Sequence, residues 1–289
     1  STSRRQASDV YKRQWLQNSG DIGFAENIQG QSKLDSEITY RDARYFNLLN
    51  TRAVQMPLKH IYNHEPIYGN HAKVQYTDEE FEKYIYFDVA RGQALNELHL
   101  SYTMMNKSKW RTLAKAIEWQ KNNYNVLQNA MFIGGNPEEN NVYGYFSWNE
   151  NGDGIIALRN PTDEKAPLTL TLNKLMGCPK DLKDVKRYNV YNLSNKESYD
   201  SYSYGDKIDL TLQPFEVKIF QFGKEDKRYP NGEAVTDFTI SFNYKGEENI
   251  EIAHNDDIDI SVVKGYVNVK CGKCPVSYTH LRAHETTLH

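Results

Sequence analysis

The hydrophobic periodicity of this 289-residue chain changes near Met131, and that change constrains the fold more than any other feature. From Trp15 to about Asn125, short apolar runs alternate with segments of helical spacing, an order typical of strand–helix units around a parallel sheet. After Met131, apolar and polar residues alternate, and turn residues recur roughly every 8–12 residues. We therefore expect an α/β part followed by an all-β part.

Three helices and two strands are predicted before residue 125. Capping boxes at Thr39–Asp42 and Thr77–Glu80 mark the starts of the first two helices. Apolar stripes place the helices at about 40–53, 77–92 and 108–122. The strands are Pro57–Tyr62 and Leu95–Ser101. This order is typical of the last quarter or so of a (β/α)8 barrel.

The second part predicts an antiparallel β-sandwich of six strands. They are expected at 142–148, 154–158, 168–172, 185–191, 208–212 and 217–222. Turns are expected at Asn151-Gly152 and Tyr204–Asp206. A polar linker then leads to a shorter β run, with strands expected at 238–242, 258–263 and 266–269.

The fold class expected is therefore multidomain. Ser1–Gln14 and Pro275–His289 resemble translated sequencing-adapter read-through, or are ordinary disordered termini, and either interpretation removes both from the fold. The expected division is residues 1–14 outside the fold, 15–128 the C-terminal part of a barrel, 129–223 a sandwich, 224–234 a linker, 235–272 a truncated jelly-roll-like β module, and 273–289 outside the fold. A reading frame cut at both ends predicts that the chain is a fragment.

Charge and cysteine content exclude several classes of function. With 35 Lys and Arg against 38 Asp and Glu, the net charge of −3 gives no basic face for nucleic acid. No apolar run approaches the roughly 18 residues of a transmembrane helix, and no signal-peptide core follows Ser1. Three cysteines make no disulfide framework, and Cys271-x-x-Cys274 has no second pair for zinc. No metal and no cofactor is predicted.

The first candidate for chemistry is Asp21, in the segment Trp15–Phe24. The barrel interpretation places this segment at the carboxyl end of a strand, where active sites of that fold lie. An Asp beside glycines can approach a ligand closely, and its carboxyl group suits proton transfer to a leaving group. The alternative is an Asp that caps a turn or helix.

The second candidate is a polar and aromatic cluster after the Pro57–Tyr62 strand. Its members are His60, Asn63, His64, Glu65 and Tyr68. Pro66 and the strand context break the helix that a His-x-x-x-His metal site needs. The residue types suit sugar binding, through hydrogen bonds to hydroxyls and stacking of a tyrosine ring. The alternative is a polar loop rim with one buried histidine.

The third candidate follows the strand Leu95–Ser101. Strand alternation sends Glu97, His99 and Ser101 to the same side. Only the last residues of a barrel strand reach the mouth, so Ser101 and Tyr102 are the predicted site residues.

Two other motifs do not support a site. Asn149–Gly154 matches half of an EF-hand loop, but its twelfth position is Asn160 and strands flank it, so a hairpin turn is predicted. Gly134–Pro137 lacks the Gly-Lys-Ser/Thr of a phosphate loop, and no G-x-S-x-G elbow is present.

Segments from both parts carry a family resemblance. A Trp–Ser–Asp loop lies at Trp15–Asp21, a strand with its helix at Glu97–Trp119, and sandwich segments at 133–137, 143–145, 154–161 and 212–217. In this order they resemble the C-terminal part of the retaining α-galactosidase clan of glycoside hydrolases, especially bacterial members with a (β/α)8 barrel and a terminal β-sandwich. Gly20 separates Ser19 from Asp21, where that clan usually has Ser next to Asp. The trailing β run resembles the start of a laminin G or concanavalin-like module.

The resemblance implies a hydrolase of α-glycosidic bonds that acts on an oligosaccharide or glycan. Asp21 would be its general acid/base, with Trp15 in the substrate pocket and an Asp nucleophile on an earlier strand, outside this sequence. This chain alone is then expected to be inactive. The resemblance also implies a secreted, periplasmic or cell-surface protein.

Two rival interpretations remain open. In one, the barrel remnant is degenerate and the β modules hold glycan, as in a carbohydrate-binding or adhesive surface protein. In the other, the chain belongs to a barrel enzyme of unrelated chemistry.

Overall fold

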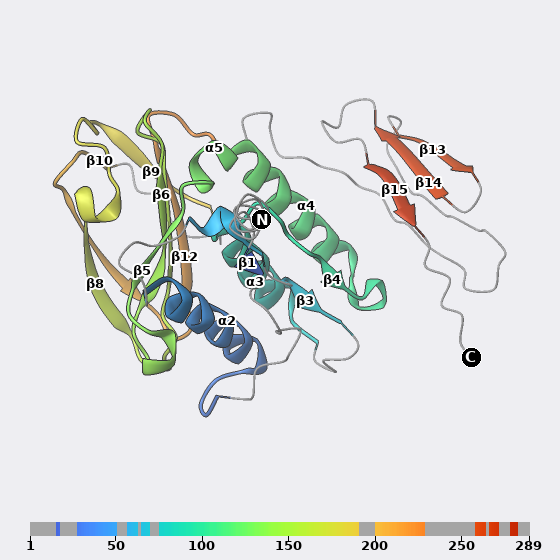
Figure 1. Ribbon diagram of the computed structural model, residues 1–289, viewed down its shortest axis with the longest axis horizontal. Coiled ribbons are helices and arrows are strands. Elements are labelled where there is room, and N and C mark those ends of the chain that lie inside the picture. The colour runs from blue at the N-terminus through green and yellow to red at the C-terminus, as the bar shows by residue number, and fades with distance from the viewer. Residues whose placement is uncertain are drawn as a thin grey trace, which may run out of the picture. The chain divides into compact units, whose positions relative to one another are not determined.

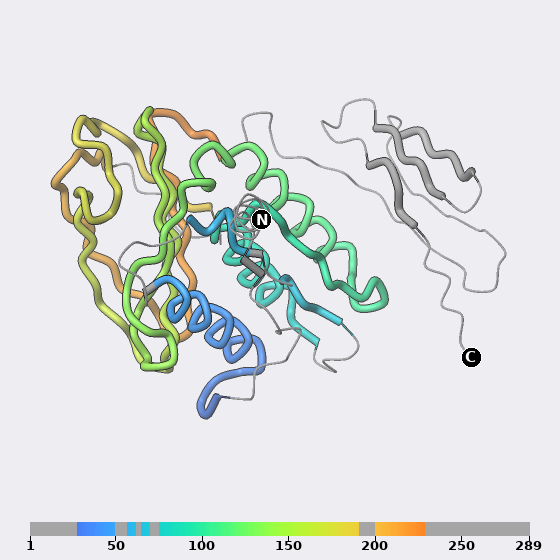
Figure 2. Tube along the Cα trace, in the orientation of Figure 1, coloured from blue at the N-terminus to red at the C-terminus, as the bar shows by residue number. Residues whose placement is uncertain are grey.

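The computed structural model describes residues 16–17, 28–50, 57–62, 65–69, 75–190, 200–228, 258–263, 266–271 and 278–282 (Figure 1). Figure 2 traces the Cα path of the first unit in the same orientation. The chain forms two compact units, Ser1–Gly232 and Glu233–His289. The first unit holds an α/β part and a β-sandwich (Figure 1). Among the described residues, no helix has the length and apolar character needed to cross a lipid bilayer.

The α/β part consists of two parallel strand pairs, each linked through a helix. Strands β1 (Leu16–Gln17) and β2 (Ile61–Tyr62) are parallel, with α2 (Lys33–Asn50) between them in sequence. Strands β3 (Ile67–Tyr68) and β4 (His99–Leu100) are parallel, with α3 (Asp78–Ala90) between them. Parallel strands joined by a helix are the repeating unit of α/β folds. The described residues form two separate pairs, and no closed barrel is present among them.

Helix α2 begins at Lys33, seven residues before the predicted start. The capping box predicted at Thr39–Asp42 is wrong, because both residues lie inside the helix and are buried. Instead, the Ser32 hydroxyl accepts a hydrogen bond from the backbone N–H of Asp35, 3.0 Å away, in the manner of an N-cap. Thr39 does not cap the helix, because its hydroxyl donates to the Gln31 side chain and accepts from the Arg159 guanidinium.

Helix α3 confirms the predicted capping box. Thr77 Oγ1 accepts from the backbone N–H of Glu80 at 3.1 Å, and the Glu80 carboxylate accepts from the backbone N–H of Thr77 at 2.8 Å. The chain leaves the helix through Gly92, whose φ is +73°. A Cβ there would lie 2.1 Å from the carbonyl oxygen of Leu127, so the neighbouring backbone also excludes a side chain.

The third predicted helix is confirmed as α4 (Lys107–Asn122), whose cap Asn106 accepts from the backbone N–H of Lys109 at 2.8 Å. The two predicted strands are shorter than expected. A 3-10 turn, η1 (Leu58–His60), precedes β2, and another, η3 (Tyr102–Met104), follows β4. Pro57 accounts for the first turn, because its carbonyl accepts from the backbone N–H of His60 at 3.0 Å.

The β-sandwich contains all six predicted strands and two more. A six-stranded antiparallel sheet has the order β10-β9-β12-β7-β6-β5, and β8 pairs with β11 in a second sheet. The strands are β5 (Met131–Gly134), β6 (Tyr143–Trp148), β7 (Gly154–Arg159), β8 (Ala166–Thr171), β9 (Val185–Asn189), β10 (Ser201–Tyr202), β11 (Lys207–Leu212) and β12 (Val217–Gly223). The short helices are α5 (Tyr124–Leu127), η4 (Pro137–Glu139) and η5 (Lys174–Met176).

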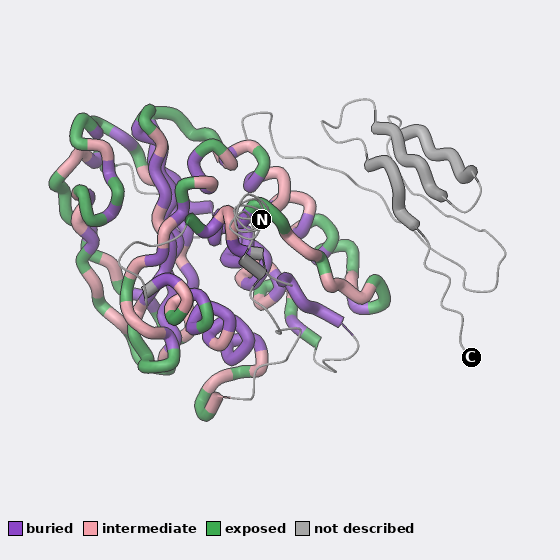
Figure 3. The backbone as a smooth tube through the Cα atoms, viewed as in Figure 1, coloured by how far each residue is buried: buried purple, intermediate pink, exposed green. Residues whose placement is uncertain are grey.

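The six-stranded sheet is covered on both faces (Figures 1 and 3). On one face, Ile156 and Leu158 join a core with residues of β8 and β11. On the other face, Ile155 and Ala157 join a core with residues of α2, α3 and α4. Every residue of β7 is buried, which explains why its sequence is a nearly continuous apolar run.

The second unit contains a three-stranded antiparallel sheet of order β13-β14-β15. Strands β13 (Ile258–Val263) and β14 (Tyr266–Cys271) confirm two predicted strands. The strand predicted at 238–242 lies outside the described residues. The third strand, β15 (Tyr278–Arg282), lies in the terminal segment for which the sequence predicts no regular structure. It pairs with β14, with Val267 opposite Leu281.

Candidate functional site

The ends of β1 and β2 define where the first two candidate segments begin. Leu16 lies opposite Ile61 and Gln17 opposite Tyr62, in parallel register. The chain therefore leaves both strands at the same edge. Asp21 follows β1, and Asn63 and His64 follow β2. Trp15, Asp21, Asn63 and His64 themselves lie outside the described residues.

The ends of β3 and β4 bring together two other candidates. Tyr68 lies opposite Leu100, and the backbone N–H of Ser101 donates to the carbonyl oxygen of Tyr68 at 2.9 Å. Ser101 is half-buried, and Tyr102 is 60% exposed. Of the three residues predicted on one side, Glu97 and His99 are in contact, because His99 Nε2 lies 3.2 Å from the Glu97 carboxylate.

The described members of the 60–68 cluster are His60, Glu65 and Tyr68, and they differ in burial. His60 is half-buried in η1. The Tyr68 side chain is 1% exposed and stacks on Tyr76, with ring centroids 5.0 Å apart. Its hydroxyl accepts from the backbone N–H of Tyr76 at 3.4 Å. Tyr68 is thus held in the aromatic core beneath the strand ends.

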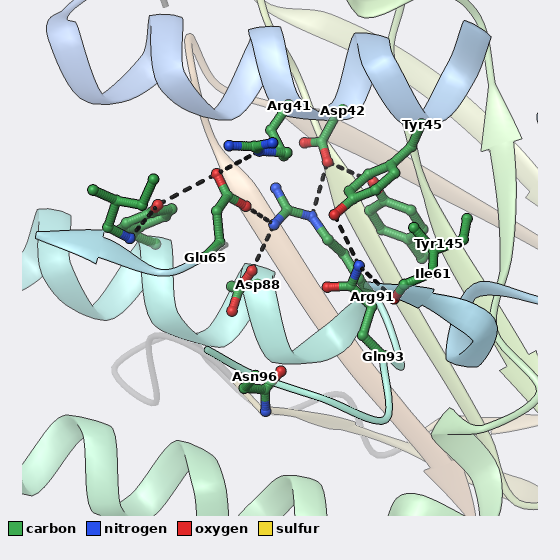
Figure 4. Close-up of polar contacts among 12 residues, drawn as sticks. Arg41, Asp42, Tyr45, Ile61, Glu65, Asp88, Arg91, Gln93, Asn96 and Tyr145 are labelled. Atoms are coloured by element: carbon green, nitrogen blue, oxygen red, sulfur yellow. Dashed lines mark hydrogen bonds and ion pairs between the residues drawn. The ribbon is translucent and has the colours of Figure 1, made fainter. Parts of the chain in front are cut away.

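Glu65 is buried in an ionic cluster that also contains Arg41, Asp42, Asp88 and Arg91 (Figure 4). Its carboxylate contacts the Arg91 guanidinium, and the Nε of Arg41 lies 3.3 Å away. The Tyr84 hydroxyl donates to Glu65 at 3.3 Å and accepts from the backbone N–H of Ile67 at 3.0 Å. The structure therefore ties the 65–67 segment to α2 and α3 from inside the core.

Arg91 lies at the centre of the ionic cluster and is fully buried. Its Nε donates to Asp42 at 2.9 Å, and its Nη1 donates to Asp88 at 2.6 Å and to Glu65. One guanidinium group thus joins carboxylates from α2, from α3 and from the segment before β3. Figure 4 shows these side chains converging between the helices.

Asp42 connects the ionic cluster to the β-sandwich. Its carboxylate accepts from the hydroxyls of Tyr143 and Tyr145, at 2.6 and 2.5 Å, and both tyrosines belong to β6. Tyr143 also accepts from Arg159 of β7 at 2.8 Å. A continuous polar network therefore crosses the interface between the helices and the sheet.

Gln93 connects the network to β2. Its side-chain N–H group donates to the Tyr45 hydroxyl at 2.8 Å and to the carbonyl oxygen of Ile61 at 3.4 Å. Strand β2, which precedes Asn63 and His64 in the sequence, is thus held by a side chain from the segment after α3.

Burial and charge act in opposite directions on the two carboxylates of this cluster that bind Arg91 Nη1. Burial alone would raise the pKa of Glu65, but the guanidinium groups of Arg91 and Arg41 outweigh it and hold that pKa below its ordinary value. Burial raises the pKa of Asp88 to about 7 against the attraction of Arg91, and the negative charges of Glu65 and Asp42 add to the increase. Asp88 therefore takes up a proton near neutral pH.

The ionic cluster is a scaffold and not an open site, since its side chains are almost fully buried. Paired charges of this kind are destabilised strongly when one partner is removed. Within the described ranges, no group of three or more His, Cys, Asp and Glu side chains is arranged to hold a metal ion.

Sequence reasoning missed Asp42, Asp88 and Arg91, although a signal was present. Ile38, Asp42, Tyr45 and Leu49 lie at helical spacing and are all buried. A charged residue on an apolar stripe indicates a buried polar contact, which the capping-box interpretation obscured.

Among known proteins, this chain is similar only to parts of solved structures. No family model and no curated protein matches the chain. A Bacteroides fragilis protein provisionally named an α-galactosidase is 14% identical, with a TM-score of 0.44 over 76% of this chain and 45% of that one. The α-galactosidase of Saccharomyces cerevisiae with raffinose is 11% identical, with a TM-score of 0.43 over 65% of this chain and 51% of that one. A GH27 β-L-arabinopyranosidase from Geobacillus stearothermophilus is 11% identical, with a TM-score of 0.43 over 64% and 41%.

The chain spans about half of the length of these three proteins or less. A Bacillus halodurans protein provisionally named an α-N-acetylgalactosaminidase is 14% identical, with a TM-score of 0.36, and this chain spans 33% of its length. These similarities describe part of a fold and do not establish an activity for the whole protein.

Proposed function

We propose that this chain is part of a glycoside hydrolase that cleaves α-glycosidic bonds with retention, and that Asp21 is its general acid/base. The observation that carries the proposal is the parallel register of β1 and β2. Parallel strands end at one sheet edge, so we expect the segment with Asp21 and the segment with Asn63 and His64 to leave from that edge. This is the arrangement by which α/β enzymes assemble a site from segments distant in sequence.

The resemblance of Trp15–Asp21 and Glu97–Trp119 to the α-galactosidase clan supports the same proposal from the sequence. The order of elements agrees with it, since parallel strand–helix units precede an antiparallel sandwich. The nucleophile would be an Asp on an earlier segment of a longer parent protein. A place outside the cell or in the periplasm rests on the resemblance alone.

The proposed mechanism is a double displacement. The upstream carboxylate attacks the anomeric carbon while Asp21 gives its proton to the departing glycosidic oxygen, which leaves a glycosyl–enzyme ester. Asp21, now ionised, takes a proton from water, whose oxygen attacks the anomeric carbon and releases the nucleophile. Retention requires the two carboxyl groups to lie roughly 5–5.5 Å apart.

The ionic cluster would have a positioning role in this enzyme. Glu65 fixes the backbone directly after Asn63 and His64, and Gln93 fixes the strand before them. Buried contacts of this kind hold binding residues in one geometry without touching the substrate.

The parent protein and its Asp21→Asn variant test the proposal on aryl and alkyl α-galactosides. Loss of the acid should lower kcat/KM by about 10²–10⁴-fold on alkyl glycosides, whose leaving groups need a proton. For nitrophenyl glycosides, whose leaving group does not need a proton, kcat/KM should fall much less. Asp163→Asn, at an exposed position of the sandwich, serves as the control. Equal loss on both substrate types would exclude the acid role.

A carbohydrate-binding or adhesive protein with a degenerate barrel would give a different result. It would bind glycan, and the parent would not turn over any of these substrates.

A further inference from the structure

Glu65 and Asp88 meet at a single nitrogen atom of the ionic cluster (Figure 4). Arg91 Nη1 donates to Asp88 Oδ1 at 2.6 Å and also to Glu65 Oε2. Glu65 is 2% exposed and Asp88 is 1% exposed, so solvent screens neither carboxyl group. Two buried carboxylates that meet in this way repel each other when both are ionised, and sharing one proton removes the repulsion.

The charges of the ionic cluster do not cancel when all of its groups are ionised. Its described members carry two guanidinium groups and three carboxyl groups, which leaves one negative charge in buried surroundings. An unpaired buried charge is costly, and a carboxyl group in such surroundings takes up a proton instead. One proton on one of the three carboxyl groups makes the cluster neutral.

Asp88 is the carboxyl group whose ionised form receives the least support. The carboxylate of Asp42 accepts from Arg91 Nε and from two tyrosine hydroxyls. That of Glu65 contacts two guanidinium groups and one tyrosine hydroxyl. Among the described residues, Asp88 accepts from Arg91 Nη1 alone, and its Oδ2 accepts no hydrogen bond. Hydrogen bonds to a carboxylate stabilise its ionised form, so the proton belongs on Asp88.

The other ionisable groups around Asp88 agree with this assignment. They come from α2, from the segment before β3 and from α3 with its C-cap, and they are Arg41, Asp42, Tyr45, Glu65, Tyr84 and Arg91. Both tyrosines stay neutral, because burial holds the pKa of each hydroxyl above its ordinary value. The two carboxylates already match the two guanidinium groups, so an ionised Asp88 would carry the unmatched charge.

The segment that begins at Glu65 is attached to α3 through the same group of side chains. Glu65 contacts Arg91, and the Tyr84 hydroxyl donates to Glu65 at 3.3 Å and accepts from the backbone N–H of Ile67 at 3.0 Å. Asp88 and Arg91 lie one helical turn apart, so their contact does not depend on this segment. When both carboxyl groups are ionised they compete for Arg91 Nη1, and Glu65 is the partner that can withdraw.

We propose that Asp88 and Glu65 share one proton in the folded protein, and that loss of this proton releases Glu65 and Ile67 from α3. The segment is then held at lower pH and released at higher pH. Because Glu65 directly follows Asn63 and His64, the release would change how these two candidate residues are positioned. The proposal stands whether or not the parent protein is a hydrolase.

Nuclear Overhauser effects in the full chain test the release. The effect between the Ile67 amide proton and the Tyr84 ring should fall about tenfold from about pH 6 to about pH 8, because a group with a pKa of about 7 becomes largely ionised over this range. The effect between the rings of Trp148 and Phe222, 5.5 Å apart in the sandwich, should keep its intensity. A constant Ile67–Tyr84 effect, or an equal fall in both effects, would overturn the proposal.

Asp88→Asn assigns the change to one group. The asparagine amide does not ionise and can donate to Glu65 in place of the shared proton, so the Ile67–Tyr84 effect should be the same at both pH values. Asp163→Asn, at an exposed position, is the matched control and should keep the tenfold fall expected of the unmodified chain. A fall in Asp88→Asn as large as in the control would show that another group releases the segment.

Carboxyl ¹³C resonances of the unmodified chain test the shared proton without any substitution. The resonances of Asp88 and Glu65 should shift together over one pH range, because coupled carboxyl groups titrate as a pair. A shift of Asp88 with a constant Glu65 resonance would reject the shared proton.

Discussion

Asp42 of α2 accepts a hydrogen bond from the Nε of Arg91, 2.9 Å away, and both side chains are fully buried. Forty-nine positions separate the two residues in the sequence. Because Asp42 also accepts from two tyrosines of β6, this pair joins the helices to the sheet. Much of the behaviour expected of the first unit follows from it.

Replacing Asp42 should destabilise the protein strongly. Asp42→Ala removes the acceptor of the Arg91 Nε and of the hydroxyls of Tyr143 and Tyr145, so the free energy of unfolding should fall by about 3–5 kcal/mol. Urea denaturation followed by circular dichroism measures it. Asp163→Ala, at an exposed position, should stay within about 0.5 kcal/mol of the unmodified chain. A loss below about 1 kcal/mol for Asp42→Ala would mean that the ionic cluster contributes little.

Asp88 should make stability depend on pH below neutrality. Its pKa is raised from the model-compound value of 3.8 to about 7 in the folded protein, so the folded state binds a proton that the unfolded state has released. The contribution of this group is complete below pH 4 or so and is lost as the pH rises toward 7.

The measurement compares Asp88→Asn with the unmodified chain by urea unfolding at about pH 4.5 and about pH 7.5. Asparagine does not titrate, so the variant should gain stability relative to the unmodified chain as the pH rises. A difference that is constant across this window would show that Asp88 does not take up the proton.

Two glycines with similar positive φ angles should respond differently to alanine. Gly92 and Gly30 have φ of +73° and +82°, so either substitution should cost roughly 1–2 kcal/mol from the backbone alone. At Gly92 the added Cβ also meets the Leu127 carbonyl, whereas at Gly30 nothing lies within 4 Å. Thermal unfolding should therefore show a clearly lower Tm for Gly92→Ala than for Gly30→Ala. Equal Tm values would mean that the backbone around Leu127 relaxes freely.

Tyr102 should affect substrate binding and not stability, if the proposed function holds. Its ring is 60% exposed directly after β4, so Tyr102→Ala should leave the urea midpoint nearly unchanged. In the parent protein, loss of the ring from the substrate pocket should raise KM by about 3–10-fold, with kcat changed less. Leu175→Ala, which removes an 84% exposed side chain from the sandwich, should change neither constant. An unchanged KM for Tyr102→Ala would remove this residue from the site.

Elements fixed by local contacts could be predicted from the sequence. The Thr77–Glu80 box, the span of α4 and the six sandwich strands were confirmed, because capping, apolar stripes and alternation act over a few residues. The start of α2 was wrong, because Thr39 and Asp42 have a capping pattern but find their partners in Arg159 and Tyr143.

The candidate site was predictable only in part for the same reason. Ser101 and Tyr102 were predicted at the end of a strand, and they directly follow β4. The inclusion of Glu65 in a buried ionic cluster was not predicted, since it depends on Arg41 in α2 and on Arg91, which follows α3. The assignments of Trp15, Asp21, Asn63 and His64 stay predictions.

The complete burial of β7 has a consequence for how the first unit can be divided. Its alternate side chains contribute to two cores, one shared with the helices and one with β8 and β11. A truncation that began the chain at the sandwich would uncover the aromatic surface formed by Phe132, Tyr143 and Tyr145, which the helices otherwise shield from water. For this protein, the boundary suggested by hydrophobic periodicity is a poor place to cut an expression fragment.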